Sequence, residues 1–223
     1  MSQILVFGDS ITFGFYDKEG GWVQRLRKFL DEKLLNELET LDKKVLRKLK
    51  APYFFVYNLG ISGNTTEDLL ERFEFETKQR FGDNKEIMFI FSIGICDSEY
   101  IHSKNSLRFS PQKFEDNIQK LINLAKKFSP EIIFVGLTPV DETKTIPIPW
   151  ATNKSCKNEY IQKFNEIIKS VCKENKIHFI EIFEKIVKLD YKKLLEDGLH
   201  PNSKGHQEIF EIVKDYLIQN KII

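Results

Sequence analysis

The chain has 223 residues, a length that suits one domain with a core of its own. Its 34 lysines and arginines almost balance 33 aspartates and glutamates, and the formal net charge of +1 argues against a nucleic-acid-binding protein. No apolar run approaches the roughly 18 residues of a membrane span, and no signal peptide is recognisable. Three cysteines, an odd number, do not suggest a disulfide framework. We therefore expect a cytoplasmic protein with a single domain over residues 1–223, no membrane span and no nucleic-acid partner.

Apolar runs alternate with helical patterns along the chain, which is typical of a parallel sheet covered by helices on both faces. The expected strands, each rich in Ile, Val or Phe, are 4–7, 54–58, 87–93, 132–137 and 177–182. Apolar residues at helical spacing predict helices over 22–35, 66–80, 114–128, 160–173 and 203–218. This pattern predicts an α/β fold of three α/β/α layers with a five-stranded parallel sheet of the flavodoxin-like type, but it does not give the strand order.

Two segments look inserted. Residues 31–50 are dense in charge and carry Leu34, Leu38, Leu41, Val45 and Leu49 in an amphipathic stripe. We interpret this segment as a helical insertion that covers one flank of the sheet; a dimer surface, and hence a homo-oligomer, is the alternative. Residues 139–155 hold three of the seven prolines plus Trp150 and follow a strand end, a good position for a loop that shapes a substrate pocket.

A candidate nucleophile follows the first strand. The run from Ile4 to Phe7 is apolar and is stopped by Gly8, Asp9 and Ser10, which indicates a buried strand that ends in a turn. Ser10 is then expected just past the carboxyl end of this strand, where open α/β sheets bind ligands. A serine at such a place is a candidate nucleophile if a base can reach it.

A candidate base lies near the other end of the chain. Asp197 and His200 are three residues apart, so their side chains can meet on a turn, and Pro201 biases His200 away from helical geometry. An imidazole held in this way can donate one N–H to Asp197 and accept from a hydroxyl at its other nitrogen. This is the arrangement of a serine triad, although the pair alone also fits a surface capping pair.

Four segments in order resemble the SGNH or GDSL hydrolase family, and the resemblance covers essentially the whole chain. They are 7–12 (FGDSIT), 58–66 (NLGISGNTT), 93–97 (IGICD) and 197–201 (DGLHP). The resemblance implies an esterase, lipase or acylhydrolase without metal or cofactor. It also implies that Ser10 is the nucleophile, His200 the base and Asp197 its orienting partner. The amides of Ser10 and Gly63 are the implied oxyanion donors.

Cys96 departs from the pattern of this family, because it stands where the family has an oxyanion asparagine. A thiol is only a weak donor, and removing one such donor costs on the order of 10²–10³ in kcat. Three interpretations stay open. The oxyanion hole is weakened, it is rebuilt with another donor such as water or Asn64, or the protein binds ligands without catalysis. We expect Asp97 to fix the turn after Cys96, and Asp9 to hold the nucleophile loop.

The remaining candidates have weaker signals. The aromatic residues near Ser10, which fit either an acyl pocket or the core, are Phe13, Phe15, Tyr16 and Trp22. We expect a solvated loop position for His102 and a structural role for His178. The function that we predict is a serine esterase acting on carboxylic esters or thioesters of a small-molecule acyl substrate. The alternatives are a ligand-binding protein of the same fold and an interaction protein that uses the stripe in residues 31–50.

Overall fold

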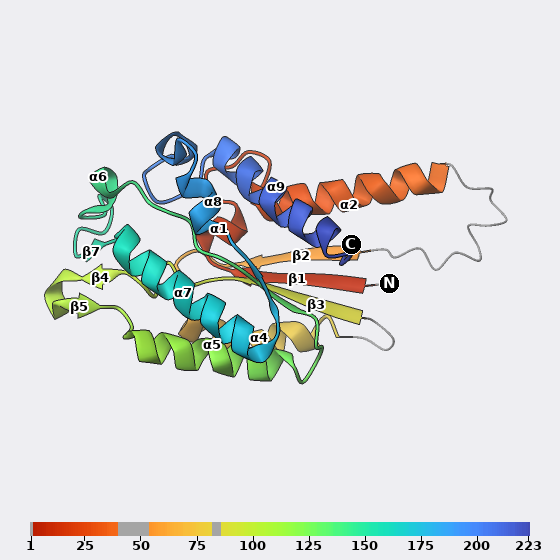
Figure 1. Cartoon of the computed structure of the whole chain (residues 1–223), viewed down its shortest axis with the longest axis horizontal. Coiled ribbons are helices and arrows are strands. Elements are labelled where there is room, and N and C mark those ends of the chain that lie inside the picture. The colour runs from red at the N-terminus through yellow and green to blue at the C-terminus, as the bar shows by residue number, and fades with distance from the viewer. Residues whose placement is uncertain (1, 40–53, 82–85) are drawn as a thin grey trace.

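A five-stranded parallel sheet forms the centre of the protein in the computed structural model, which describes residues 2–39, 54–81 and 86–223 (Figure 1). The strand order is β2-β1-β3-β6-β8. Their bounds are β1 (Ser2–Gly8), β2 (Phe54–Gly60), β3 (Glu86–Ser92), β6 (Ile132–Val135) and β8 (His178–Ile180). Each lies where the apolar runs predict a strand, so the predicted α/β fold with a five-stranded parallel sheet is confirmed.

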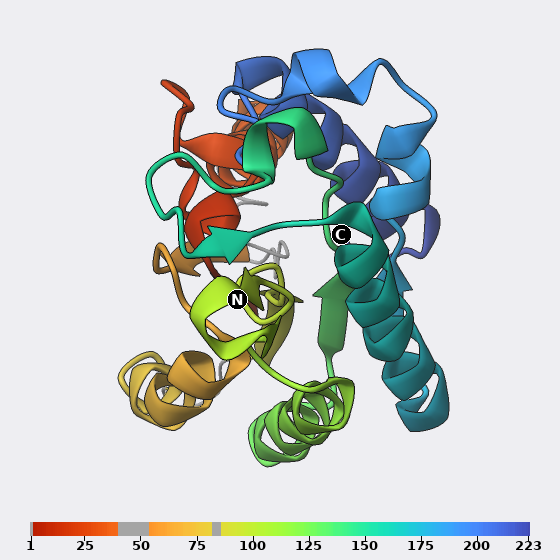
Figure 2. The same ribbon diagram turned by 90° about the vertical axis from the view of Figure 1, so that its left-hand side faces the viewer.

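Within the described parts of the chain, five long helices cover the two faces of this sheet. They are α2 (Gly21–Glu39), α4 (Thr66–Lys78), α5 (Pro111–Ala125), α7 (Asn158–Asn175) and α9 (Ser203–Gln219). Helices α2 and α9 lie together on one face, and α4, α5 and α7 lie on the other (Figure 2). Every predicted helix is present, and the three predicted layers are confirmed. The helices lie on both faces because a parallel sheet needs an apolar cover on each of them.

The carboxyl edge of the sheet carries short elements that the sequence pattern does not reveal. Three two-residue strands form a small antiparallel sheet, namely β4 (Tyr100–Ile101), β5 (Ser106–Leu107) and β7 (Lys154–Ser155). The short helices are α1 (Ser10–Phe13), α6 (Glu142–Thr145), α8 (Phe183–Val187), η1 (His102–Lys104) and η2 (Tyr191–Leu194). Elements this short show no periodicity, so only their contacts define them.

The predicted insertion is only partly within the described residues. Its first part continues helix α2 as far as Glu39, so residues 31–39 extend a core helix. Leu35 is 57% exposed at this end of the helix. The rest of the stripe, with Leu41, Val45 and Leu49, lies outside the described residues. The proposed roles of residues 31–50, a flank cover or a dimer surface, stay predictions.

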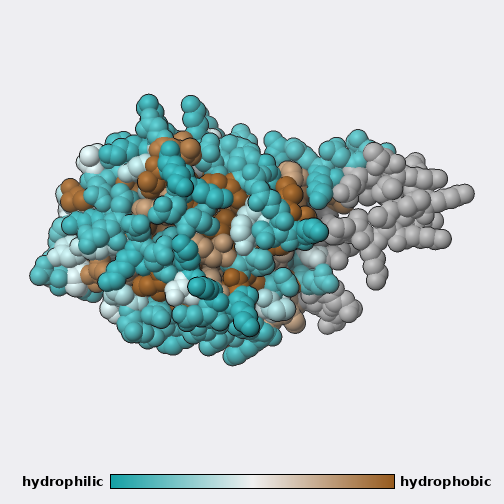
Figure 3. Space-filling model, viewed as in Figure 1, coloured by the Kyte–Doolittle hydropathy of each residue, from teal (hydrophilic) through white to brown (hydrophobic). Residues whose placement is uncertain are grey.

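None of the helices in the described parts of the chain is both long and apolar enough to cross a membrane. Hydrophilic residues predominate on the face shown in Figure 3, and hydrophobic residues form small separate areas between them. Scattered apolar residues of this kind are normal on the surface of a folded protein.

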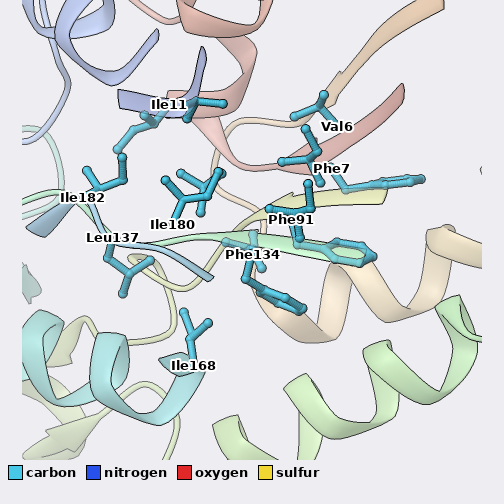
Figure 4. Packing of buried hydrophobic residues seen from close by; sticks show 14 of the residues in the cluster. Val6, Phe7, Ile11, Phe91, Phe134, Leu137, Ile168, Ile180 and Ile182 are labelled. Atoms are coloured by element: carbon cyan, nitrogen blue, oxygen red, sulfur yellow. The ribbon is translucent and has the colours of Figure 1, made fainter. Parts of the chain in front are cut away.

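Phenylalanines fill the layer between the sheet and helix α4. The ring of Phe73, on α4, lies 5.1 Å from that of Phe7, 5.2 Å from that of Phe89 and 5.7 Å from that of Phe91. Phe7 and Phe91 come from the neighbouring strands β1 and β3. The ring of Phe91 also lies 5.0 Å from that of Phe134 on β6 (Figure 4). This cluster fixes α4 against the strand that ends at the candidate nucleophile.

We expect Phe73→Ala to lower the free energy of unfolding by about 3–5 kcal/mol, because it removes a fully buried ring from this cluster. Phe75→Ala is the matched control, since Phe75 lies on the same helix but is 69% exposed. The control should stay within about 0.5 kcal/mol of the wild type. Urea unfolding measures both values, and equal losses in the two variants would contradict the assignment of Phe73 to the core.

Candidate active site

The turn after β1 holds Ser10 at the first residue of helix α1. Asp9 caps this helix by accepting a hydrogen bond from the amide of Ile11 at 3.0 Å. A glycine is needed at position 8, because a Cβ there would lie 2.0 Å from Oγ1 of Thr12 and 2.3 Å from the carbonyl oxygen of Ser92. Ser10 is 8% exposed, so the strand and the turn deliver a nearly buried hydroxyl to the carboxyl edge of the sheet.

Ser10, His200 and Asp197 form a continuous chain of hydrogen bonds. Nε2 of His200 lies 3.0 Å from Oγ of Ser10, and Nδ1 lies 2.7 Å from Oδ2 of Asp197. The amides of His200 and Leu199 donate to the other carboxylate oxygen, at 2.8 and 2.9 Å. Burial acts to raise the pKa of Asp197, but the hydrogen bonds from His200 and from these amides outweigh it and hold the pKa below its ordinary value. The carboxylate therefore favours the tautomer with a proton on Nδ1, which leaves Nε2 to accept from the hydroxyl of Ser10.

The loop that carries His200 is fixed on both sides. Leu195 and Pro201 form an isolated antiparallel bridge, and the carbonyl of Gly198 accepts from the amide of Asp141 at 2.8 Å. Asn202 then caps helix α9 by accepting from the amides at the start of that helix. These contacts hold the imidazole over the end of β1 although nearly the whole chain separates the two.

Two amides that the sequence predicts as oxyanion donors lie on neighbouring loops. Gly63 follows β2 with a φ of +81°, a conformation that favours glycine. The amide of Ile61, in the same loop, donates to the carbonyl of Gly8 at 3.1 Å and so ties this loop to the nucleophile turn. Within the described residues, neither the Ser10 nor the Gly63 amide has an acceptor of its own. Both are therefore available to a ligand, and their role as oxyanion donors stays a prediction.

Cys96 sits in the third loop of the site as a neutral thiol. Burial, together with the nearby acids Asp9, Glu99 and Asp97, raises its pKa well above the ordinary value. The side chain therefore presents an S–H, which is a weak hydrogen-bond donor, and not a reactive thiolate.

Asp97 binds the loop of Cys96 to helix α4. Its carboxylate accepts from the amide of Thr66 at 3.0 Å and from the hydroxyl of the same residue. Burial raises the pKa of Asp97 to about 7, against the effect of these hydrogen bonds. These contacts agree with a turn-fixing role. Asn64 also bonds to helix α4, but through another residue of that helix: its Oδ1 accepts from Nε of Arg72 at 2.8 Å.

Three aromatic rings lie close to the imidazole of His200. The ring of Phe15 lies 5.1 Å from it, that of Tyr16 5.9 Å and that of Trp150 5.9 Å, with the indole stacked at an interplanar angle of 30°. These three side chains are 40%, 52% and 54% exposed, so the interpretation of Phe15 and Tyr16 as core residues is wrong. Phe13 is also exposed, whereas Trp22 is fully buried in the core.

The position of Trp150 supports the expectation that the proline-rich loop 139–155 reaches the site. The aromatic wall around His200 therefore combines two segments, the turn that follows α1 and this loop.

The residues that support these three rings could not be predicted from the sequence. Nε2 of the fully buried His206 lies 3.2 Å from the carbonyl oxygen of Phe15, and burial holds the pKa of His206 below its ordinary value. Arg25 pairs with Asp17, directly after the wall, and donates to Oγ of Ser203 at 3.0 Å. These pairs join helices α2 and α9 to the loop before α2, and no local sequence signal announces them.

The two other histidines have structural partners. Nε2 of His102 lies 2.9 Å from Oγ of Ser155, and Nδ1 of His178 lies 2.9 Å from the hydroxyl of Tyr216. His102 is exposed, in agreement with its expected loop position.

Burial raises the pKa of Asp9 to about 6, and this predicts a pH dependence of stability. Between about pH 4 and pH 6 the folded state keeps a proton that the unfolded state has released, so the free energy of unfolding falls as the pH rises through this range. Asp9→Asn keeps the helix cap but does not titrate. From pH 4 to pH 7 its stability should therefore gain about 2 kcal/mol relative to the wild type. Urea unfolding across this range tests the prediction, and parallel curves for the two proteins would contradict it.

Comparisons with known proteins agree on the family and the fold. The family model for the GDSL-like Lipase/Acylhydrolase matches residues 4–213. The multidomain esterase of Ruminococcus flavefaciens is 26% identical to this chain in an alignment of 238 positions. The alignment covers 96% of this chain but only 29% of that protein.

Solved structures also share the fold, and two of them serve as examples. A lipase/acylhydrolase from Enterococcus faecalis has a TM-score of 0.70 at 20% identity, covering 97% of this chain and 95% of that one. The acetyl xylan esterase AlAXEase has a TM-score of 0.71 at 19% identity, covering 96% and 99%.

Proposed function

We propose that this chain, which belongs to the GDSL-like lipase/acylhydrolase family, hydrolyses carboxylic esters or thioesters of small acylated substrates through Ser10, His200 and Asp197. The observation that carries the proposal is the chain of hydrogen bonds from Oγ of Ser10 through the imidazole to the Asp197 carboxylate. Each residue has the partner that its role requires, since the nucleophile needs a base and the base needs an orienting group.

In the proposed first step, Oγ of Ser10 attacks the carbonyl carbon while its proton moves to Nε2 of His200. The Asp197 carboxylate stabilises the imidazolium that forms. As the tetrahedral intermediate collapses, His200 returns the proton to the leaving alcohol or thiol, and the acyl group stays on Ser10. Water then attacks the acyl-enzyme with His200 again as the base, which releases the acid and restores the serine.

The same geometry supports one orientation of the substrate. The leaving oxygen or sulfur has to lie near Nε2 of His200 in order to receive its proton, so the alcohol or thiol half faces the rings of Phe15, Tyr16 and Trp150. The carbonyl oxygen points to the amides of Ser10 and Gly63. Because one structural relative is named an acetyl xylan esterase, acetylated xylan belongs among the substrates to test.

The direct test is hydrolysis of p-nitrophenyl acetate by the wild type and by Ser10→Ala. We expect the wild type to release nitrophenol in a burst that matches the enzyme concentration, followed by slower turnover, because the activated nitrophenyl ester acylates Ser10 faster than water removes the acyl group. Ser10→Ala should lose both phases. Ser62→Ala is the control, since Ser62 is an exposed serine in the loop of Gly63, and it should keep the burst. If Ser10→Ala hydrolyses the ester as fast as the wild type, the proposal is excluded.

Cys96→Asn tests whether the thiol weakens the oxyanion hole. If it does, the carboxamide adds a strong donor and kcat should rise, up to the order of 10²–10³ that one such donor contributes. An unchanged kcat would indicate that another group already supplies the donor. If neither the wild type nor Cys96→Asn turns over any ester but ligands still bind, the alternative of a ligand-binding protein is favoured.

A further inference from the structure

The amides of Ser10 and Gly63 have to meet at a single oxygen atom, yet they lie on separate loops. Ser10 follows β1, and Gly63 follows β2. In an active site, a displacement of about 1 Å costs on the order of 10² in rate. Any group that fixes these two loops relative to each other therefore bears directly on catalysis.

One arginine side chain bonds to both loops. Nε of Arg72, on helix α4, donates to Oδ1 of Asn64 at 2.8 Å, directly after Gly63. Nη2 of the same side chain donates at 3.2 Å to the carbonyl oxygen of Gly8, two residues before Ser10. Because a guanidinium group is planar and rigid, its two nitrogens hold the two acceptors at a set separation.

Arg72 is itself held in place. Its side chain is only 14% exposed, and Nη1 donates to Oε1 of Glu76 at 2.8 Å. The centre of the guanidinium lies 5.6 Å from the centroid of the Phe7 ring. Helix α4 also reaches the third loop of the site, since the amide of Thr66 donates to Asp97. A well-fixed side chain on a well-fixed helix thus connects the two loops.

We infer, on the basis of the proposed function, that Arg72 is a positioning residue of the oxyanion hole, which sets the distance between the amides of Ser10 and Gly63 without touching the substrate. A purely structural role would lower stability and leave the rate of the folded enzyme unchanged. A positioning role lowers kcat and weakens the binding of compounds that resemble the tetrahedral intermediate, because both depend on the two amides together.

The test compares Arg72→Lys with Arg80→Lys. Lysine keeps the positive charge of Arg72 but loses the planar fork. Arg80 is the matched control, because it lies just beyond α4 and donates at 2.8 Å to the carbonyl of Glu76. The measurements are kcat and KM for p-nitrophenyl acetate, and the inhibition constant of a methyl trifluoromethyl ketone, which forms a tetrahedral adduct with a serine nucleophile.

For Arg72→Lys we expect kcat to fall about 10- to 100-fold with KM within about twofold. The affinity for the ketone should fall by the same factor as kcat/KM. Arg80→Lys should match the wild type in all three. Asn64→Ala serves as a second variant if Arg72→Lys does not fold, because it removes one acceptor and keeps the arginine. It should reduce kcat and ketone affinity in parallel.

Two results would overturn the inference alone. One is a folded Arg72→Lys with wild-type kcat, or, if it does not fold, an Asn64→Ala with wild-type kcat. The other is a loss of kcat without a loss of affinity for the ketone. A wild type without Ser10-dependent turnover is a different result, because it would overturn the proposed function and this inference together.

Discussion

The hydrogen bond between Oγ of Ser10 and Nε2 of His200 joins residues that are 190 positions apart, and the rest of the site depends on it. It forms because β1 lies inside the sheet and the loop before α9 returns across the carboxyl end of that strand. On one side, the cap at Asp9 holds the hydroxyl; on the other, the Leu195–Pro201 bridge holds the imidazole. The covered sheet is thus a frame that keeps these two groups at hydrogen-bond distance.

Two buried carboxyl groups around this contact lower the stability of the fold. Asp9 and Asp97 are nearly inaccessible carboxyls whose pKa values burial raises to about 6 and about 7. Each of them accepts a backbone hydrogen bond that fixes a loop of the site. Burial of each carboxyl therefore lowers the free energy of unfolding, but the same carboxyl holds one loop in place. The phenylalanine cluster around Phe73 offsets such penalties and also anchors α4, the helix that contacts all three loops. Helix α4 therefore contributes both to the stability of the fold and to the geometry of the site.

Local sequence patterns were sufficient to predict the five strands, the five long helices and the layered α/β fold. Apolar runs and helical spacing are patterns of residues that are close in sequence. Strands that are buried on both faces have to be apolar, so these patterns are easily recognised. The short motifs around Ser10 and His200 could be recognised for a similar reason. A sharp turn after a strand needs glycine and a capping acid, and an oriented imidazole needs a carboxylate a few residues away.

By itself, then, the sequence determined which segments form the sheet and its cover, and which side chains are candidates for the chemistry. Only the tertiary structure decided the strand order, the exposure of Phe15 and Tyr16 beside His200, and the contacts of Arg72 and His206. These features depend on contacts between residues that are far apart along the chain. No periodicity records such contacts, because they exist only once the strands have paired and the helices have packed on the sheet.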